Sequence, residues 1–299
     1  MGTTGIAALL AVAAALMVGI GDVAEQRSAQ QVTDKSVSTP ALFVRLLRDP
    51  RWWLGTLVAA GGFGLQAAAL GLGSVVLVQA LSVTSLLFAL LISSITNHRK
   101  ISRGQAIWAL LLATAVTAVV TVGNPQAGTA RGSVKTWAIV ASVLGPVLLL
   151  CLIGSRLTSG WRSALLQGLM SGTLWGLFSV LTKGVVDQLG HGIPQLLKTP
   201  ELYVWVLLAI AATAREQSAF RAGPLTASLP AVTIAEPLVG SVLGIAVLGE
   251  TLNTDHLGMV ALALSVAVMA AAVVALAHSQ AIDGPADAVR SDSPRTDAV

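Results

Sequence analysis

Glu236 is the residue whose position most strongly suggests chemistry. It lies near the middle of the apolar segment 224–248, and Pro237 follows it directly. An ionisable side chain at membrane depth is costly and indicates a functional site, and a proline removes one donor from the helical hydrogen-bond ladder. The pair predicts a broken helix beside a substrate-binding carboxylate. The structural alternative is a protonated or hydrogen-bonded glutamate that holds helices together.

A second polar group closes the first apolar segment, residues 5–25. Asp22, Glu25 and Gln26 are spaced so that they share one face of a helix. We expect this face to meet a cation or a substrate amine. The alternative is that the three residues mark the cytoplasmic end of a span, with Glu25 satisfied by water or by Arg27.

Three further side chains are candidate substrate contacts. Gln66 and Gln217 lie at matching places in the two halves of the chain, although amides also join helices inside membranes. Lys183 lies late in the apolar segment 163–186. Its alternative role is an i to i+4 salt bridge with Asp187.

No metal, cofactor or catalytic site is expected. The four histidines lack the spacing of a zinc site, and the single cysteine, Cys151, lies in an apolar run. No nucleophile stands beside a base, and no glycine-rich loop resembles a phosphate cradle. The net charge of +4 comes from scattered basic residues, so nucleic acid is not an expected partner. Enzymatic activity is therefore not expected.

The elements that must position these residues are membrane-spanning helices. The 299 residues are 55% hydrophobic and 11% charged, with a mean hydropathy of +0.79. A bilayer core about 30 Å thick needs roughly 20 apolar residues per helix. Because the runs lack the alternation of a β-barrel, we predict an all-α polytopic membrane protein. The nine predicted helices cover residues 5–25, 52–72, 74–96, 104–122, 134–154, 163–186, 202–220, 224–248 and 255–277.

Basic residues are divided unevenly between the loops. Assigning the loops alternately to two sides places fourteen of the 18 Lys and Arg residues on one side. By the positive-inside rule this side is cytoplasmic, so we expect the N-terminus outside and the C-terminus inside an inner (plasma) membrane. Arg215 and Glu216 are interpreted as an anchor at this side and left out of the site. The stretch 25–51 is expected to lie along the lipid interface, and the tail 278–299 to be disordered.

The chain resembles itself at a shift of about 150 residues, which indicates a duplication. Trp52–Gly73 aligns with Tyr203–Gly223, and this alignment matches Gln66 with Gln217. Two four-helix units separated by one helix must enter the membrane from opposite sides, so the repeats are inverted. The predicted organisation is a first repeat, a linking helix, a second repeat and a tail, at residues 1–122, 123–160, 161–277 and 278–299.

Three stretches carry a resemblance to a known family. They are the second span, with Gly61-Gly62 and Leu65-Gln66-Ala67-Ala68-Ala69, the run Val76–Ser85, and the stretch from Ala222 through Glu236-Pro237 to Glu250. In their order and spacing they resemble the drug/metabolite transporter superfamily, EamA-like branch. The resemblance covers nearly all the chain and implies a transporter with its substrate site between two inverted halves.

Nine spans, an outside N-terminus and the opening Trp52-Trp53-Leu54-Gly55 are more similar to the NIPA branch, whose members are described as magnesium transporters. The chain departs from that branch at two places. Gly61-Gly62 stands where Gly-Glu is usual, and Gln79-Ala80 where Thr-Pro is usual. Magnesium transport is therefore the alternative, and Gln79 joins the candidate substrate contacts.

The sequence thus predicts a secondary transporter that moves a small organic solute or a lipid-linked metabolite by alternating access. Coupling to a proton or cation through Glu236 or Asp22, and a homodimer, are left open. The alternatives are a magnesium transporter of the NIPA type and a membrane scaffold without transport activity.

Overall fold

Helices make up almost all of the chain that the structure describes. The computed structural model describes residues 2–31, 50–96, 100–223 and 225–282; the side chains of 22–31, 50–56, 59, 225 and 280–282 lie outside this description. The elements are α1 (Thr3–Gln31), α3 (Pro50–Leu72), α4 (Val75–Ser82), α5 (Ser85–Thr96), α6 (Arg103–Gly123), β1 (Pro125–Gln126), α7 (Val134–Leu157), α8 (Trp161–Gly190), α9 (Ile193–Lys198), α10 (Pro200–Ala222), α11 (Leu225–Leu248), β2 (Thr251–Leu252) and α12 (His256–Ile282).

Among the described residues, seven segments are long and apolar enough to cross a membrane: Thr3–Gly21, Val75–Thr96, Arg103–Gly123, Val134–Leu157, Trp161–Gly190, Thr226–Leu248 and His256–Ser279. This confirms an all-α polytopic membrane protein. The expected count of nine spans is not confirmed. Two of the nine expected spans are not among these seven segments. One is α10, which carries Arg215 and Glu216, and the other is α3, whose described apolar part is the shorter Ala60–Leu72.

Two predicted helices differ in their continuity. The third span is interrupted between α4 and α5 at Val83 and Thr84, where the Thr84 hydroxyl donates to the Leu81 carbonyl. The helix expected to break at Pro237 does not break, since α11 continues through both Pro230 and Pro237. Each proline costs the helix one internal hydrogen bond, and close packing against a neighbouring helix holds the rest.

Two helix ends also extend further than expected. α1 continues to Gln31, so Asp22, Glu25 and Gln26 do not close it. α12 continues to Ile282 and therefore includes the first residues of the segment 278–299 that was expected to be disordered. The rest of that tail, and most of the expected interfacial stretch 25–51, lie outside the described residues.

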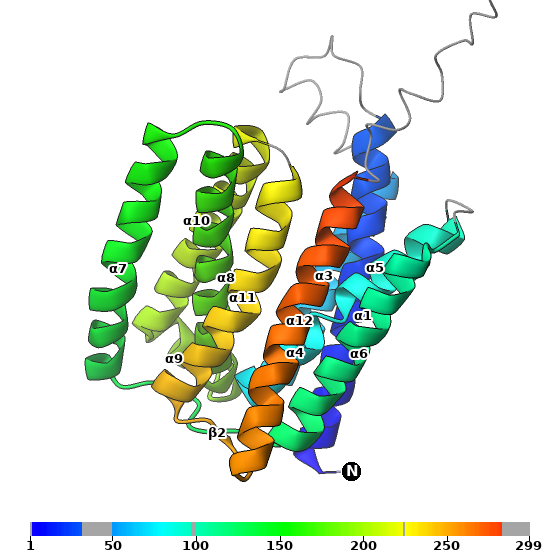
Figure 1. Cartoon of the computed structure of the whole chain (residues 1–299). Helices are drawn as coiled ribbons and strands as arrows, with labels where there is room; N and C mark the ends of the chain where they lie inside the picture. The colour runs from blue at the N-terminus through cyan, green and yellow to red at the C-terminus, as the bar shows by residue number, and fades with distance from the viewer. Residues whose placement is uncertain (1, 32–49, 97–99, 224, 283–299) are drawn as a thin grey trace, which may run out of the picture.

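α8 is the central helix of the second half of the chain. It packs against α10 and α11, and more weakly against α7 and α3, while α1 packs against α3 and α5. α6 packs against α12, and α7 lies at the edge of the bundle (Figure 1). Small residues at these interfaces let the helices approach closely, which is how helices associate where lipid removes most of the hydrophobic drive.

The two ends of the bundle are defined by their loop contacts. At one end β1 pairs with β2, and Arg131 forms an ion pair with Glu201. We name this the Arg131 end; the connecting segments 124–133, 191–199 and 249–255, which include β1, α9 and β2, lie there (Figure 1). At the opposite end the turn at Gly160 contacts Gly223.

Candidate functional site

α8 and α11 approach each other along a row of glycines. A Cβ added to Gly172 would lie 2.6 Å from the carbonyl oxygen of Val232, and one added to Gly176 would lie 2.9 Å from that of Glu236. Gly168 meets the Ser228 carbonyl in the same way. The four-residue spacing places these small residues on one face of α8, and the close packing that they allow holds the backbone of Glu236 against α8.

Glu236 and Glu216 form a pair of acidic side chains beside this row. Glu236 is half-buried, and within the described residues no hydrogen bond or ion pair engages its carboxylate. Glu216, from α10, is close enough for charge repulsion with Glu236. Its Oε2 accepts a hydrogen bond of 3.0 Å from Trp175 Nε1 on α8. Hereafter Glu216 and Glu236 are the carboxylate pair.

An aromatic cluster extends from Trp175 toward the first half of the chain. Phe178 packs edge-on against Trp175 with ring centroids 5.2 Å apart, and it stacks on Trp205 at 4.9 Å. Phe63, from α3, lies 5.5 Å from Phe178. Trp205 is fixed by a hydrogen bond of 2.8 Å from its Nε1 to Thr182 Oγ1. These four rings, the aromatic cluster, join α3 to α8 and α10.

Trp175 belongs to the aromatic cluster and donates a hydrogen bond to Glu216, so it connects the cluster to the carboxylate pair. Charge and aromatic surface are therefore combined in one region. Carboxylates at membrane depth attract a cation or carry a proton. Aromatic faces accept apolar rings and cations. Small-molecule sites combine these two features, because a few polar groups orient a ligand against apolar walls.

Lys183 and Glu250 form a buried ion pair at the Arg131 end. The distance from Lys183 Nζ to Glu250 Oε1 is 3.1 Å, and the two side chains are 5% and 1% exposed. Lys183 Nζ also donates to the Gly73 carbonyl at 2.8 Å. The expected alternative partner of Lys183, Asp187, instead accepts a hydrogen bond from Gln188. The i to i+4 pairing is therefore wrong, because Lys183 points into the bundle, where Glu250 can compensate its charge.

Glu250 also completes the first turn of α4. Its Oε1 accepts from Val75 N at 2.7 Å and its Oε2 from Val76 N at 3.0 Å, while the Ser74 hydroxyl accepts from Leu77 N. These amides have no partner within a helix, and a carboxylate there is favoured by the helix dipole. Gly249 has a φ of +65°, a conformation open to glycine, which reverses the chain and directs Glu250 back to α4.

Gln79 is completely buried on α4, against Gly240 of α11. Its Oε1 accepts from the Ser82 hydroxyl at 3.3 Å, whereas its Nε2 has no partner in the described part of the chain. Gly240 is one helical turn beyond Glu236, so both face the same side of α11. The structure therefore places the Gln79 amide, an unsatisfied donor, within a turn of Glu236 along α11.

The other predicted site residues are placed less informatively. Asp22, Glu25 and Gln26 lie on α1, and their side chains are outside the described part. Gln66 is half-buried on α3, while Gln217 is exposed on α10. The expectation that both face one cavity stays a prediction.

Two acidic residues were missed by the sequence reasoning. Glu216 is expected, with Arg215, to anchor a helix end, yet its side chain reaches Trp175. Glu250 was noted only within a motif. The sequence does contain a signal for Glu250. It follows an apolar span directly after Gly249, and the predicted spans hold few acidic residues that could compensate the charge of Lys183.

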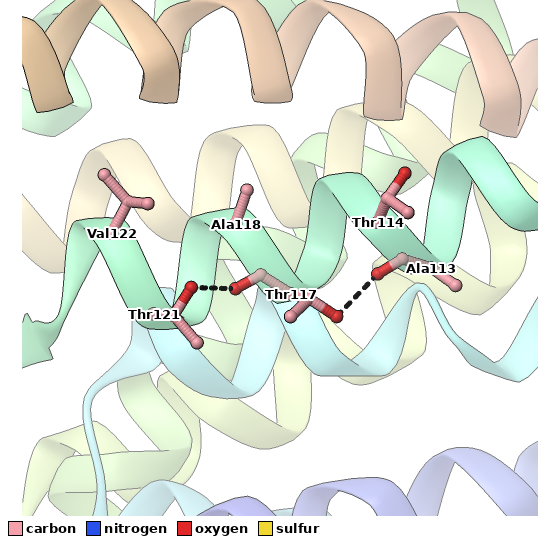
Figure 2. A pocket seen from close by; sticks show the side chains of 6 residues that line it. All are labelled: Ala113, Thr114, Thr117, Ala118, Thr121 and Val122. Atoms are coloured by element: carbon pink, nitrogen blue, oxygen red, sulfur yellow. Dashed lines mark hydrogen bonds between the residues drawn. The ribbon is translucent and has the colours of Figure 1, made fainter.

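Neither a metal centre nor the groove along α6 is a better candidate site within the described residues. Within the described residues no three His, Cys, Asp or Glu side chains gather in a way that would hold a metal ion. A groove of about 390 Å³ runs along α6, lined by Ala113, Thr114, Thr117, Ala118, Thr121 and Val122. Figure 2 shows the Thr117 and Thr121 hydroxyls donating to carbonyls of their own helix. The groove therefore presents satisfied hydroxyls and methyl groups, which suit lipid or another helix better than a polar solute.

Comparison with known proteins gives one informative relative. An uncharacterized protein of Corynebacterium glutamicum, Cgl0250/cg0304, is 33% identical over 279 residues, which are 92% of this chain and 95% of that protein. No family model matches the chain, and no solved structure matches it.

Proposed function

The chain belongs to the same family as this corynebacterial protein, and we propose that it is a secondary transporter of a small organic solute or lipid-linked metabolite. One observation carries the proposal. Glu236 lies within a membrane-spanning helix, half-buried and without a described partner, within range of charge repulsion from Glu216, whose carboxylate accepts a hydrogen bond from Trp175 of the aromatic cluster. Such a carboxylate is costly to keep in a membrane unless it meets a ligand or a proton.

The packing of the helices supports the proposed inverted repeats. α1 packs against α3 and the pair α4 and α5, and α8 packs in the same way against α10 and α11. α1 begins at the Arg131 end, where Ala7 contacts Gly73, whereas α8 ends there (Figure 1). The two matching helices therefore run in opposite directions. A duplicated unit inserted both ways favours alternating access at the interface between its copies.

Apart from the contact of Phe63 with Phe178, several contacts that tie α3 and α4 to α8 and α11 lie toward the Arg131 end. They include Gly71 with Val186, Lys183 with Gly73, and Gly240 with Gln79. This distribution supports a state in which the carboxylate pair communicates with the opposite end. Arg156 and Arg162 flank the turn at that opposite end. By the positive-inside rule we assign this opposite end to the cytoplasmic side of the plasma membrane. The proposed topology then has nine spans and an external N-terminus.

Transport by purified protein in liposomes tests the proposal. A panel of organic cations, amines and neutral metabolites is first screened for ligands that raise the melting temperature, and the flux of each such ligand is then measured. We expect Glu236→Gln to reduce this flux at least about tenfold, which corresponds to about 1.4 kcal/mol of lost interaction. Glu201→Gln, a carboxylate in a partly exposed ion pair, is the matched control and should leave the flux unchanged.

Two results would remove the proposal. One is that no compound of the panel stabilises the protein or crosses the membrane. The other is that Glu236→Gln and Glu201→Gln variants transport equally well. A flux of Mg²⁺ without any organic flux would instead support the magnesium alternative.

A further inference from the structure

The buried ion pair joins the two halves of the chain through three separate elements. Lys183 belongs to α8, Glu250 follows α11, and their partners Gly73, Val75 and Val76 lie at the turn that begins α4. Each hydrogen bond that this pair makes with the α4 amides or the Gly73 carbonyl therefore crosses between the two halves. Separating the halves at this end must break all of them together.

Apolar contacts surround the pair at the same level. A Cβ added to Gly71 would lie 2.6 Å from Val186 Cγ1, and one added to Gly244 would lie 3.2 Å from the Val75 Cβ. Both contacts again join α3 or α4 to α8 or α11. Gln79, one turn further along α4, is completely buried behind them. The pair and these contacts therefore separate Gln79 from the water at the Arg131 end.

A buried ion pair is suited to a contact that must form and separate reversibly. A buried ion pair loses hydration when it forms, and this loss offsets most of the attraction between its charges. When the two halves part, both charges and the α4 amides recover water. The assembled and the separated states are therefore closer in free energy than the strength of the contacts suggests, whereas one partner without the other is unfavourable in the closed state.

We propose that Lys183 and Glu250 are the gate residues of this transporter and close the Arg131 end of the path to the carboxylate pair. The inference rests on the proposed function. Opening requires the Glu250 carboxylate to leave Lys183 and the first turn of α4, so that α4 and α11 can separate at Gln79 and Gly240. Loss of either partner should weaken the closed state.

Cysteine labelling tests the gate without a substrate. In a Cys151→Ala background, Gln79→Cys is treated with a charged maleimide in detergent, which gives the reagent access to both ends. We expect little labelling with the ion pair intact, and a rise of at least about tenfold after Glu250→Gln or Lys183→Met. Glu201→Gln, which breaks the partly exposed Arg131 pair at the same end, should leave the labelling unchanged.

A second reporter separates opening from loss of the fold. Ala164 is completely buried near the opposite end of α8, so Ala164→Cys should stay unlabelled in every variant. Unchanged labelling of Gln79→Cys after Glu250→Gln would overturn the gate. Equal labelling of both reporters would overturn it as well, because the pair would then maintain the whole fold.

Disulfide formation measures the same opening independently. The Cβ positions of residues 71 and 186 are 3.6 Å apart, within the range of about 3.5–4.5 Å for a disulfide. Gly71→Cys with Val186→Cys should therefore cross-link rapidly, and about tenfold more slowly after Glu250→Gln. An unchanged rate would contradict the gate. Because neither measurement involves transport, an inactive liposome assay would refute the proposed function without deciding these results.

Discussion

Glu236 and Glu250 are acidic residues of the same type, from α11 and from the turn that follows it, in opposite situations. Glu250 is 1% exposed at its side chain and has three polar partners, Lys183 Nζ and the amides of Val75 and Val76. Glu236 is half-buried, and no described residue bonds its carboxylate. The first is satisfied by contacts within the closed state, so its loss should lower the stability of that state. The Glu236 carboxylate is available to a ligand or a proton, so its loss should reduce function more than stability.

The largest effect is expected for Glu250→Ala. It leaves Lys183 buried without its counter-charge and two α4 amides without an acceptor, so unfolding should become easier by about 3–5 kcal/mol. Thermal or denaturant unfolding in detergent measures this. Glu201→Ala, at a pair whose side chains are 38% and 22% exposed, should cost less than about 1 kcal/mol. Similar losses at both sites would show that Glu250 is no better satisfied than a surface residue.

Exchanging the charges of the pair distinguishes the ion pair from the helix contact. In the double variant Lys183→Glu with Glu250→Lys, opposite charges are kept, but position 250 can no longer accept from Val75 and Val76. We expect the double variant to regain less than half of the stability that Glu250→Ala loses, because two unsatisfied amides cost about 1–3 kcal/mol each. Full recovery would mean that charge alone matters at this site.

Gly172→Ala is expected to have an intermediate effect. Its new Cβ would lie 2.6 Å from the Val232 carbonyl oxygen, so α8 and α11 must move apart, at a cost of about 1–3 kcal/mol. Gly64→Ala on α3 is the control, since nothing lies within 4 Å of its new Cβ. That variant should be neutral or more stable by up to about 1 kcal/mol. The two melting temperatures should therefore shift in opposite directions, and a parallel shift would contradict close packing around Glu236.

A smaller effect is expected for Trp175→Phe, which keeps the ring but removes the hydrogen bond to Glu216. The loss in stability should be about 0.5–1.5 kcal/mol. Trp161→Phe, at a ring that is 55% exposed, should be neutral. If Trp175→Phe is equally neutral, the bond to Glu216 does not hold the carboxylate pair in place.

The smallest change in stability is expected for Glu236→Gln. The carboxylate has no described partner to lose, and a neutral amide is easier to bury, so unfolding should change by less than about 1 kcal/mol. Melting temperatures of Glu236→Gln and Glu250→Gln, measured side by side, check the comparison directly. A large destabilisation by Glu236→Gln would place Glu236 in a structural role like that of Glu250.

Particular residues show why part of this site was predictable. Glu236 stands alone in an apolar segment, and Gly168, Gly172 and Gly176 repeat at the spacing of one helix face. Both are local patterns. Glu216 was hidden by its basic neighbours, which made it look like part of a helix end. Its contact with Trp175 depends on the packing of α10 against α8.

The membrane, the helical class and the isolated carboxylate were determined by the sequence, because hydrophobic length and period are properties of consecutive residues. The uninterrupted path of α11 through Pro237, the division of α4 from α5, and the pairing of Lys183 with Glu250 were decided by the tertiary structure. The paired residues are 67 positions apart in the sequence. Burial of either charge is favourable only when the other lies beside it. A buried charge is compensated by its neighbours in space, and these are set by how whole helices pack.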